Sequence, residues 1–482
     1  MNLVNLISQK ELIERRGQIK KVFFYRICGA GMGPAAVLVK QAGFEVHGAD
    51  SAFYPPMSTF LETTGIPLYK LDQVNSSFLK NYDLIVVGNS VSGKSDAARM
   101  IEESGIPFTS FPSALGSLVL KEKNVIGIAG THGKTTTTYF MTQLLEKLGQ
   151  NPGYLVGGII EGRDPAKLGA KYFVIESDEY DSSYFHKISK FRLYELKNLI
   201  LTSLEFDHAD IFSSVEKIED EFRDVIPEMK STLIFNQDYP SAMKLFKDYF
   251  GKKSHQQWYL YGEGSEAGPF DVKTFENRSE FSILWKNQRI NFYSSVVGLH
   301  NVLNLTSCLI YLLSEGFNVP DVQKAAQDIG MVKRRQEVRG RYRDMIVIDD
   351  FAHHPRAITV TLDAIRARFK NKKVITIFEP ISATARSSIF QGEFRDSLCA
   401  SDKVIIAKAS IPTTALTGQD LDVELLTKEI GQQGKPSICV TNLDDLRRSI
   451  DQYTEKDAVL LVLSNRTCLG LWESGFVQEI KP

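Results

Sequence analysis

The chain has 482 residues, which is too long for one ordinary hydrophobic core and predicts about three domains. Its 57 Lys and Arg residues balance 58 Asp and Glu residues, which argues against nucleic-acid binding. Five scattered cysteines, never spaced as C-x-x-C, argue against a disulfide framework or a zinc site and suit a reducing cytoplasm. Because no apolar run approaches roughly 18 residues and the N-terminus lacks a signal sequence, we expect a soluble cytoplasmic protein without membrane contact. The sequence leaves the oligomeric state open.

The first binding site is predicted within residues 21–50, which have the pattern of a strand, a glycine-rich turn, a helix and a second strand ending at Asp50. Ahead of them, ISQKELIERRGQIKK predicts a short polar helix or a tail. The turn resembles a dinucleotide fingerprint, but its third glycine comes one place too early for G-x-G-x-x-G, so it is weak evidence for a nicotinamide cofactor. We expect a phosphate or sugar-nucleotide site here instead. The turn residues are Gly29, Ala30, Gly31, Met32 and Gly33.

The clearest motif is GTHGKTTTT at residues 130–138, between the apolar run NVIGIA and an amphipathic segment. A strand that breaks into a glycine-rich turn and then a helix offers backbone N–H groups and a positive helix end to a polyphosphate. Lys134 is placed to reach the terminal phosphates, and the Thr135 hydroxyl to hold Mg²⁺. Ile128 stands where G-x-x-x-x-G-K-[ST] has its first glycine, so the loop is a variant. A ligand-free turn is the alternative, which the Gly-x-x-Gly-Lys-Thr core disfavours. The other predicted loop contacts are Gly130, Thr131, His132, Gly133 and Thr136.

Polar side chains follow the next predicted strands of this domain. Four carboxylates lie within residues 176–181 directly after a strand, and LEFDH brings His208 after the next one. Because ligands bind beyond the carboxyl ends of parallel strands, these groups should lie beside the phosphate loop. Mg²⁺ prefers oxygen ligands, so Glu176 is the candidate ligand together with Thr135. A solvated acidic loop is the alternative for Glu176, and His208 is equally well explained as a structural histidine.

The second half of the chain carries further candidates. Residues 255–297 predict short antiparallel strands, including WYLYG at 258–262, and residues 298–316 predict a buried helix. On one face of that helix, Asn301 and Asn304 are placed to offer amides to a purine, although ordinary capping explains them equally well. The basic stretch 331–344 is interpreted as a charged connection whose arginines clamp phosphates or form a solvated linker. The sequence does not distinguish between them.

The last domain is predicted to contain strands at 345–350, 372–380, 402–408, 436–441 and 457–465, separated by helices. Its first strand ends in IDDFAHHP, which brings two carboxylates and two imidazoles before Pro355. The predicted fold class is therefore α/β with three domains. We expect a Rossmann-like domain at 1–120, a central P-loop ATPase-type mixed sheet at 121–335, and a second Rossmann-like domain at 336–482.

Taken together and in order, GTHGKTTT, ESDEYD, LEFDHADIF, GLHNVLN, VKRRQEVRG, DDFAHHP and FEP resemble the Mur ligases over nearly the whole chain. That resemblance implies a three-domain, ATP-dependent ligase that joins amino acids or peptides to UDP-N-acetylmuramic acid. It implies that the γ-phosphoryl group of ATP activates the lactyl carboxylate as an acyl phosphate, which an amine then attacks.

The resemblance also implies a role for each matching residue. Lys134 contacts the β- and γ-phosphates, Thr135 and Glu176 hold the first Mg²⁺, and His208 meets a second. The remaining implied ATP contacts are His300, Asn301, Asn304, Arg335 and Asp350. The implied UDP-sugar contacts are the turn from Gly29 to Gly33, Asp50 and Ser90. The implied contacts to the incoming peptide are His354, Arg386, Ser464 and Asn465.

Two stretches point to a substrate within the family. YPPMST at 54–59 and the pair Ser464-Asn465 resemble the members that add the murein tripeptide L-alanyl-γ-D-glutamyl-meso-diaminopimelate during peptidoglycan recycling. The alternative amine is L-alanine, and an alternative of another class is a regulator that hydrolyses ATP slowly. The chain departs from the pattern of its relatives at several positions. The departures are Ser203 for Asn, Ile381 and Ala383 in FEPISATAR, and Arg466-Thr467-Cys468-Leu469 in place of a glycine-rich turn.

Overall fold

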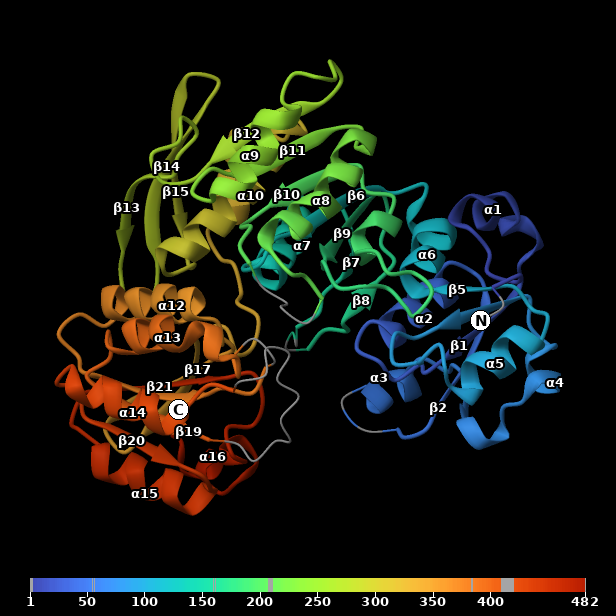
Figure 1. The fold of residues 1–482 in the computed structure, drawn as a ribbon. Helices are drawn as coiled ribbons and strands as arrows, with labels where there is room; N and C mark the ends of the chain where they lie inside the picture. The colour runs from blue at the N-terminus through green and yellow to red at the C-terminus, as the bar shows by residue number, and fades with distance from the viewer. Residues whose placement is uncertain are drawn as a thin grey trace. The chain divides into compact units, whose positions relative to one another are not determined.

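The computed structural model describes residues 3–53, 55, 57–158, 160, 162–206, 211–382, 385–408 and 420–481. The chain forms two compact units, and Figure 1 labels helices and strands along the chain. The first contains residues 1–205, 215–267 and 307–325, and the second contains residues 206–214, 268–306 and 326–482. In the described part of the chain, the helices are too short or too polar to cross a membrane.

The N-terminal part of the first unit is a five-stranded parallel sheet with the order β3-β2-β1-β4-β5. Its strands are β1 Lys21–Tyr25, β2 Glu45–Asp50, β3 Leu68–Lys70, β4 Leu84–Val87 and β5 Phe108–Ser110. Its helices are α1 Gln9–Glu14, α2 Met32–Gln41, α3 Met57–Thr63, α4 Ser76–Leu79, α5 Asp96–Glu103 and α6 Phe111–Leu115. β1 and β4 are apolar runs buried on both faces, as expected of central parallel strands. The strand order reverses between them, which confirms the predicted Rossmann-like domain.

The central part of the first unit is a seven-stranded sheet with the order β12-β11-β10-β6-β9-β7-β8. Its strands are β6 Asn124–Ala129, β7 Gly153–Leu155, β8 Ala166–Lys167, β9 Tyr172–Ser177, β10 Asn198–Leu201, β11 Thr232–Asn236 and β12 Gln257–Tyr261. Its helices are α7 Lys134–Lys147, α8 Val215–Val225 and α9 Pro240–Tyr249. Only β8 runs antiparallel to its described neighbour, β7, so the predicted mixed sheet is confirmed.

The prediction of an antiparallel strand at WYLYG was wrong. β12 pairs in parallel with β11, because helix α9 separates the two strands and returns the chain in the same direction. The later strands are antiparallel as predicted: β13 Phe270–Thr274, β14 Ser279–Trp285 and β15 Gln288–Ser294 form a three-stranded sheet in the second unit. Helices α10 Leu299–Ser314 and α11 Val319–Ala326 follow.

The C-terminal sheet of the second unit has six strands in the order β16-β17-β21-β18-β19-β20. Its strands are β16 Glu337–Tyr342, β17 Met345–Asp350, β18 Val374–Glu379, β19 Lys403–Ala407, β20 Ser437–Val440 and β21 Val459–Ser464. Its helices are α12 Pro355–Arg368, α13 Gln391–Leu398, α14 Val423–Gln432, α15 Leu443–Tyr453 and α16 Phe476–Glu479. β16 is antiparallel to β17, so part of the stretch predicted as a charged connection is an edge strand.

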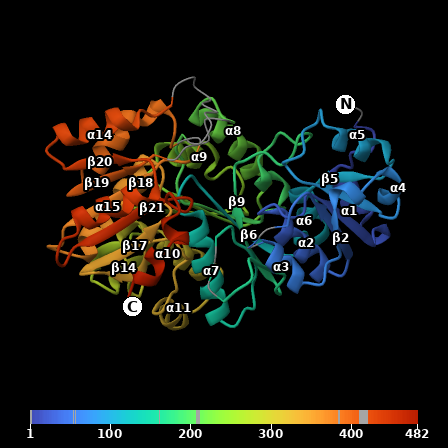
Figure 2. The same cartoon turned by 90° about the horizontal axis from the view of Figure 1, so that it is seen from below.

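Two hydrophobic cores cover the two faces of this sheet. Helices α12, α13 and α14 contribute to the core on one face, through side chains such as Leu362, Phe394 and Leu426. Helices α15 and α16 contribute to the core on the other face, through Leu446 and Phe476. Figure 2 shows strands β17 to β21 with helices α14 and α15 from below. The connections that leave the carboxyl ends of these strands therefore lead to helices on different faces of the sheet.

Candidate active site

The phosphate loop connects the end of β6 at Ala129 to the start of α7 at Lys134. Gly130 and Gly133 have φ angles of +136° and +84°, which glycine adopts without strain. A Cβ atom on Gly130 would lie 2.4 Å from Oγ1 of Thr202. Ile128 is a fully buried residue within β6, so the position where the longer motif has glycine belongs to the sheet. This loop is therefore shorter than the standard one.

The end of β10 holds the phosphate loop in place. The backbone N–H of His132 donates to Oγ of Ser203 at 2.7 Å, and Oγ1 of Thr202 donates to the His132 carbonyl at 2.5 Å. Nε2 of His132 lies 3.2 Å from a carboxylate oxygen of Glu205. Oγ1 of Thr131 exchanges hydrogen bonds with the backbone of Glu205. Ser203, one of the departures from the family pattern, thus fixes the loop backbone, and the side chains of Thr131 and His132 serve the same loop.

Lys134 points toward the acidic segment that follows β9. Its Nζ lies 2.8 Å from Oε2 of Glu179 and 3.7 Å from Oδ1 of Asp178. Burial alone would lower the pKa of this ammonium, but the two carboxylates outweigh burial and raise the pKa above its usual value. The side chain is 14% exposed, so a charged, nearly buried ammonium stands beside the loop. It can exchange these carboxylates for phosphate oxygens.

The two residues predicted to hold the first Mg²⁺ are in contact. Oγ1 of Thr135 donates to Oε2 of Glu176 at 3.0 Å, and the N–H of Gly157 donates to Oε1 at 2.5 Å. Burial raises the pKa of the Glu176 carboxyl group. Within the described residues, no cluster of three or more His, Cys, Asp or Glu side chains could hold a metal alone. One carboxylate and one hydroxyl fit Mg²⁺, which commonly takes its other ligands from phosphates and water. His208, the predicted second ligand, lies outside the described residues.

The glycine-rich turn after β1 is held by Asp50. The N–H of Cys28 donates to Oδ2 of Asp50 at 2.9 Å, and Nη1 of Arg26 lies 3.3 Å from Oδ1. A Cβ atom on Gly31 would lie 2.9 Å from Cζ of Phe111. The Asp50 carboxylate therefore organises the turn backbone.

The other predicted UDP-sugar residues lie around the same strand ends. Gly29 and Ala30 are exposed, whereas the Met32 side chain is buried and could offer a ligand only its backbone. A Cβ atom on Gly33 would lie 2.3 Å from Sδ of Met57, which explains the glycine there. Ser90 is exposed just beyond the end of β4. The strand order reverses between β1 and β4, and ligands of such sheets bind at this point.

A loop at residues 178–190, which we call the bridging loop, connects the two sites of the first unit. Its start carries the carboxylates that contact Lys134. Its tip contacts the carboxyl ends of β4 and β5. Nδ2 of Asn89 donates to Oδ1 of Asp181 at 3.0 Å, and Nδ1 of His186 lies 3.0 Å from Oγ of Ser110. Phe185 packs edge-on against Phe108 with ring centroids 5.2 Å apart. This role was not predicted from the sequence, although the aromatic pair within DSSYFHKIS was a usable signal.

In the second unit, the residues predicted on the adenine side lie at the start of α10. Nε2 of His300 lies 2.9 Å from Nε2 of Gln336, while its Nδ1 has no hydrogen-bond partner among the described residues. Burial, with the charge of Arg335, lowers the pKa of His300 to about 4, so the ring is neutral at physiological pH. The Asn301 amide donates to the Val297 carbonyl at 2.9 Å, and Asn304 is buried on the same helix. Asn301 thus serves its own helix start.

Arg334 and Arg335 have different surroundings. The Arg335 guanidinium lies 5.0 Å from the Phe351 ring centroid and forms no ion pair within the described residues. Both oxygens of Asp350 accept backbone N–H groups, from Gln336 and Ala352, each at 2.8 Å. Asp350 therefore fixes the backbone beside Arg335, and the positive charge of Arg335 opposes the rise in the pKa of the Asp350 carboxyl group that burial causes. Arg334 instead connects β17 to the turn that follows β21, because its guanidinium contacts Asp349 and the carbonyls of Ser464 and Arg466.

The residues predicted to contact the incoming amine lie near the carboxyl ends of the C-terminal strands. His354 is buried directly before α12, with its ring 5.1 Å from that of Phe390. Arg386 and Asn465 are half-buried. The Ser464 hydroxyl is fully buried and donates to Oε2 of Glu379 at 2.5 Å. Ser464 is thus engaged within the protein.

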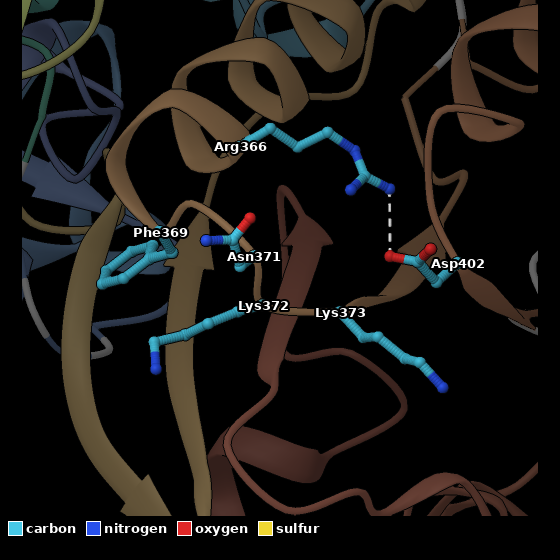
Figure 3. A pocket seen from close by; sticks show the side chains of 6 residues that line it. All are labelled: Arg366, Phe369, Asn371, Lys372, Lys373 and Asp402. Atoms are coloured by element: carbon cyan, nitrogen blue, oxygen red, sulfur yellow. Dashed lines mark hydrogen bonds and ion pairs between the residues drawn. The ribbon is translucent and has the colours of Figure 1, made fainter.

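A separate cavity of about 360 Å³ lies at the amino ends of β18 and β19 (Figure 3). The residues that line it are Arg366, Phe369, Asn371, Lys372, Lys373 and Asp402. Arg366 pairs with Asp402 at 3.0 Å, and Lys373 pairs with Glu455 at 2.8 Å. The two lysines point away from each other. Because the charges are paired within the protein and lie away from the carboxyl strand ends, this cavity is not part of the candidate site.

Three family profiles match this chain along its length. They are the Mur ligase family catalytic domain at residues 21–123, the Mur ligase middle domain at 128–312, and the Mur ligase glutamate ligase domain at 334–465. The chain belongs to the Mur ligase family, and it is an ATP-dependent, ADP-forming ligase.

Individual relatives share most of the length of the chain. A UDP-N-acetylmuramate–L-alanyl-γ-D-glutamyl-meso-2,6-diaminoheptandioate ligase from Haemophilus influenzae is 32% identical over 94% of this chain and 98% of its own. A UDP-N-acetylmuramate–L-alanine ligase from Streptococcus mutans is 30% identical over 91% of this chain and 92% of its own. Among solved structures, a murein peptide ligase from Psychrobacter arcticus is similar, with a TM-score of 0.64 and 27% identity over 94% of this chain and 97% of its own.

Proposed function

We propose that this enzyme joins L-alanyl-γ-D-glutamyl-meso-diaminopimelate to the lactyl carboxylate of UDP-N-acetylmuramic acid, in peptidoglycan recycling. The observation that carries the proposal is the 32% identity, over 94% of the chain, to a ligase named for this tripeptide. The family resemblance of YPPMST adds weight, although Tyr54 and Pro56 lie outside the described residues. We place the reaction in the cytoplasm, where the free cysteines would stay reduced.

In the proposed mechanism, the phosphate loop and Lys134 bind the β- and γ-phosphates of ATP. The backbone N–H groups at the start of α7 favour negative charge, and the Lys134 ammonium offsets the charge that develops as the γ-phosphoryl group moves. Thr135 and Glu176 would hold Mg²⁺, which when bound supplies further positive charge to the phosphate oxygens. The work of these residues is positional and electrostatic.

The sugar nucleotide would bind at the turn from Gly29 to Gly33 and at Ser90, where the strand order reverses. Its lactyl carboxylate receives the γ-phosphoryl group and becomes an acyl phosphate, and ADP is released. The amine of the incoming peptide then attacks the acyl carbon, and phosphate leaves as the amide bond forms. His300, Asn301, Arg335 and Asp350 belong to the second unit, so the proposed nucleotide contacts come from residues of both units. The domain limits 1–120, 121–335 and 336–482 are part of this proposal.

L-Alanine is the second candidate amine. The 30% identity to a ligase named for L-alanine, over 91% of the chain, favours it. The same nucleotide and sugar-nucleotide sites would serve both substrates, so the choice depends on the C-terminal strand ends.

The deciding experiment measures ADP release from ATP, Mg²⁺ and UDP-N-acetylmuramic acid with either the tripeptide or L-alanine. We expect a higher kcat/KM for the tripeptide and no release when the sugar nucleotide is left out. A preference for L-alanine would replace the tripeptide by the second candidate. ATP hydrolysis at a rate that depends on neither the sugar nucleotide nor the amine would favour the alternative of a regulator that hydrolyses ATP slowly. The Lys134→Ala variant should remain folded and lose ligation, and it serves as the background control.

A further inference from the structure

The turn after β21, residues 464–470, lies where the connections of the C-terminal sheet change from one face of the sheet to the other. The chain leaves β17, β18 and β19 toward the helices of one core, but it leaves β21 toward the other core, through Cys468, Leu471 and Phe476. β21 lies between β17 and β18. The crevice beside the carboxyl end of such a strand is where open α/β sheets bind their ligands. The turn after β21 therefore forms one wall of the predicted amine site.

A buried carboxyl group, that of Glu379, stabilises this turn through hydrogen bonds. Glu379, which is 1% exposed at the end of β18, accepts hydrogen bonds from the Ser464 hydroxyl at 2.5 Å, the Cys468 N–H at 3.0 Å and the Leu469 N–H at 2.7 Å. Cys468 and Leu469 have φ angles of +55° and +51°. The backbone thus takes a conformation usual for glycine, and the Glu379 carboxyl group stabilises it.

A second set of contacts fixes Arg466 at the top of the turn. Its N–H donates to Oγ of Ser464 at 2.9 Å, and its carbonyl accepts from Nη2 of Arg334 at 2.7 Å. Nη2 of Arg334 also donates to the Ser464 carbonyl at 2.5 Å, while its Nε lies 3.2 Å from Oδ2 of Asp349. The backbone of Arg466 is therefore anchored on both sides.

The Arg466 side chain, by contrast, is exposed, and its guanidinium has no ion-pair partner in the ranges that the structure covers. A guanidinium offers several N–H donors in a planar fork that matches a carboxylate. An arginine on a rigid backbone at a ligand-binding strand end loses little freedom when it pairs with an anion.

We propose that Arg466 binds a carboxylate of the incoming peptide and so favours the tripeptide over L-alanine. The inference rests on the proposed function. L-Alanine has one carboxylate, next to the attacking amine, whereas the tripeptide has further carboxylates along its length. Arg466 pairs with one of these distal carboxylates and acts in substrate selection, while the acyl phosphate is formed without it.

The test compares wild type with Arg466→Ala and Arg466→Lys, using ADP release with the tripeptide and with analogues in which one distal carboxylate is an amide. We expect Arg466→Ala to lower kcat/KM for the tripeptide by roughly tenfold or more, as for loss of a charged hydrogen bond. Arg466→Lys should restore part of the loss. For one of the amide analogues, the kcat/KM of the wild type should already be reduced by the same factor, and Arg466→Ala should not reduce it further. KM for ATP and for UDP-N-acetylmuramic acid should stay unchanged.

Arg448→Ala is the matched control, since Arg448 is an exposed arginine of the same sheet domain, on α15. It should leave every kinetic constant unchanged. A normal kcat/KM of Arg466→Ala for the tripeptide would overturn the inference alone, as would an equal loss for all analogues. Absence of ADP release from wild type with the tripeptide would overturn the proposed function instead, so the two failures are distinguishable.

Discussion

Replacing Glu379 by alanine should open the turn after β21. The substitution removes the acceptor of three buried or half-buried donors: the Ser464 hydroxyl and the N–H groups of Cys468 and Leu469. A buried donor left without a partner costs about 1–3 kcal/mol, so the loss is about 3–9 kcal/mol if the turn keeps its shape. The positive φ angles of Cys468 and Leu469 cost about 1–2 kcal/mol each and favour release. The turn should therefore rearrange before the sheet unfolds.

Hydrogen–deuterium exchange followed by mass spectrometry measures this opening locally. In Glu379→Ala, residues 464–471 should exchange at least tenfold faster, while peptides from β6 and α7 keep their wild-type rates. KM for the incoming amine should rise with it. Glu424→Ala provides a control, since this exposed carboxylate of the same domain pairs with Lys408 on the surface. Unchanged exchange at Cys468 and Leu469 in Glu379→Ala would refute the assignment of Glu379 as the support of the turn.

Three further predictions follow from individual contacts. Gly130→Ala, at a φ of +136°, should abolish nucleotide binding in a titration, whereas Gly149→Ala, at a φ of +73° with open space around it, should keep binding. Because the bridging loop contacts both sites, we expect the sugar nucleotide to tighten ATP binding in the wild type; His186→Ala removes the contact to Ser110 and should abolish that effect in calorimetric titrations. Burial lowers the pKa of His300 from 6.5 to about 4, so between these pH values the unfolded chain binds a proton at this ring that the folded chain does not. The free energy of unfolding should therefore rise as the pH increases from 4 to 6.5. Denaturant titrations of His300→Gln should show a weaker rise.

Sequence patterns predicted much of the fold because parallel strands buried on both faces are continuous apolar runs. NVIGIA and VLLVLS are such runs, and both are central strands. The parallel direction of β12 was missed because a short alternating strand looks the same in either direction, and the direction depends on the preceding connection. The edge strand β16 was missed because its charged residues, such as Arg339 and Arg341, have the pattern of a linker.

The candidate site, like the fold, was predicted only in part from the sequence. The pair Thr135 and Glu176 was predicted because a loop motif and a strand end fix the positions of both residues. The partners of Lys134 could not be chosen among four neighbouring carboxylates, since which of them turns inward depends on packing that sequence does not specify. The role of Glu379 was not predicted, because no sequence pattern around a carboxyl group indicates that it accepts hydrogen bonds from the backbone N–H groups of a distant turn.

In the proposed reaction, the phosphate loop and the turn after β21 lie in different units. The phosphate loop and the turn proposed to bind the sugar nucleotide lie in the first unit and are connected by the bridging loop, whose start contacts Lys134 and whose tip contacts the ends of β4 and β5. The turn after β21 belongs to the second unit and depends on Glu379 and Arg334 for its shape. Changes in that turn can alter the choice of amine while the contacts that bind ATP stay intact. Substitutions at residues 466–469 are therefore expected to change the choice of amine before they change ATP binding, because these residues lie in the turn after β21 and not in the phosphate loop.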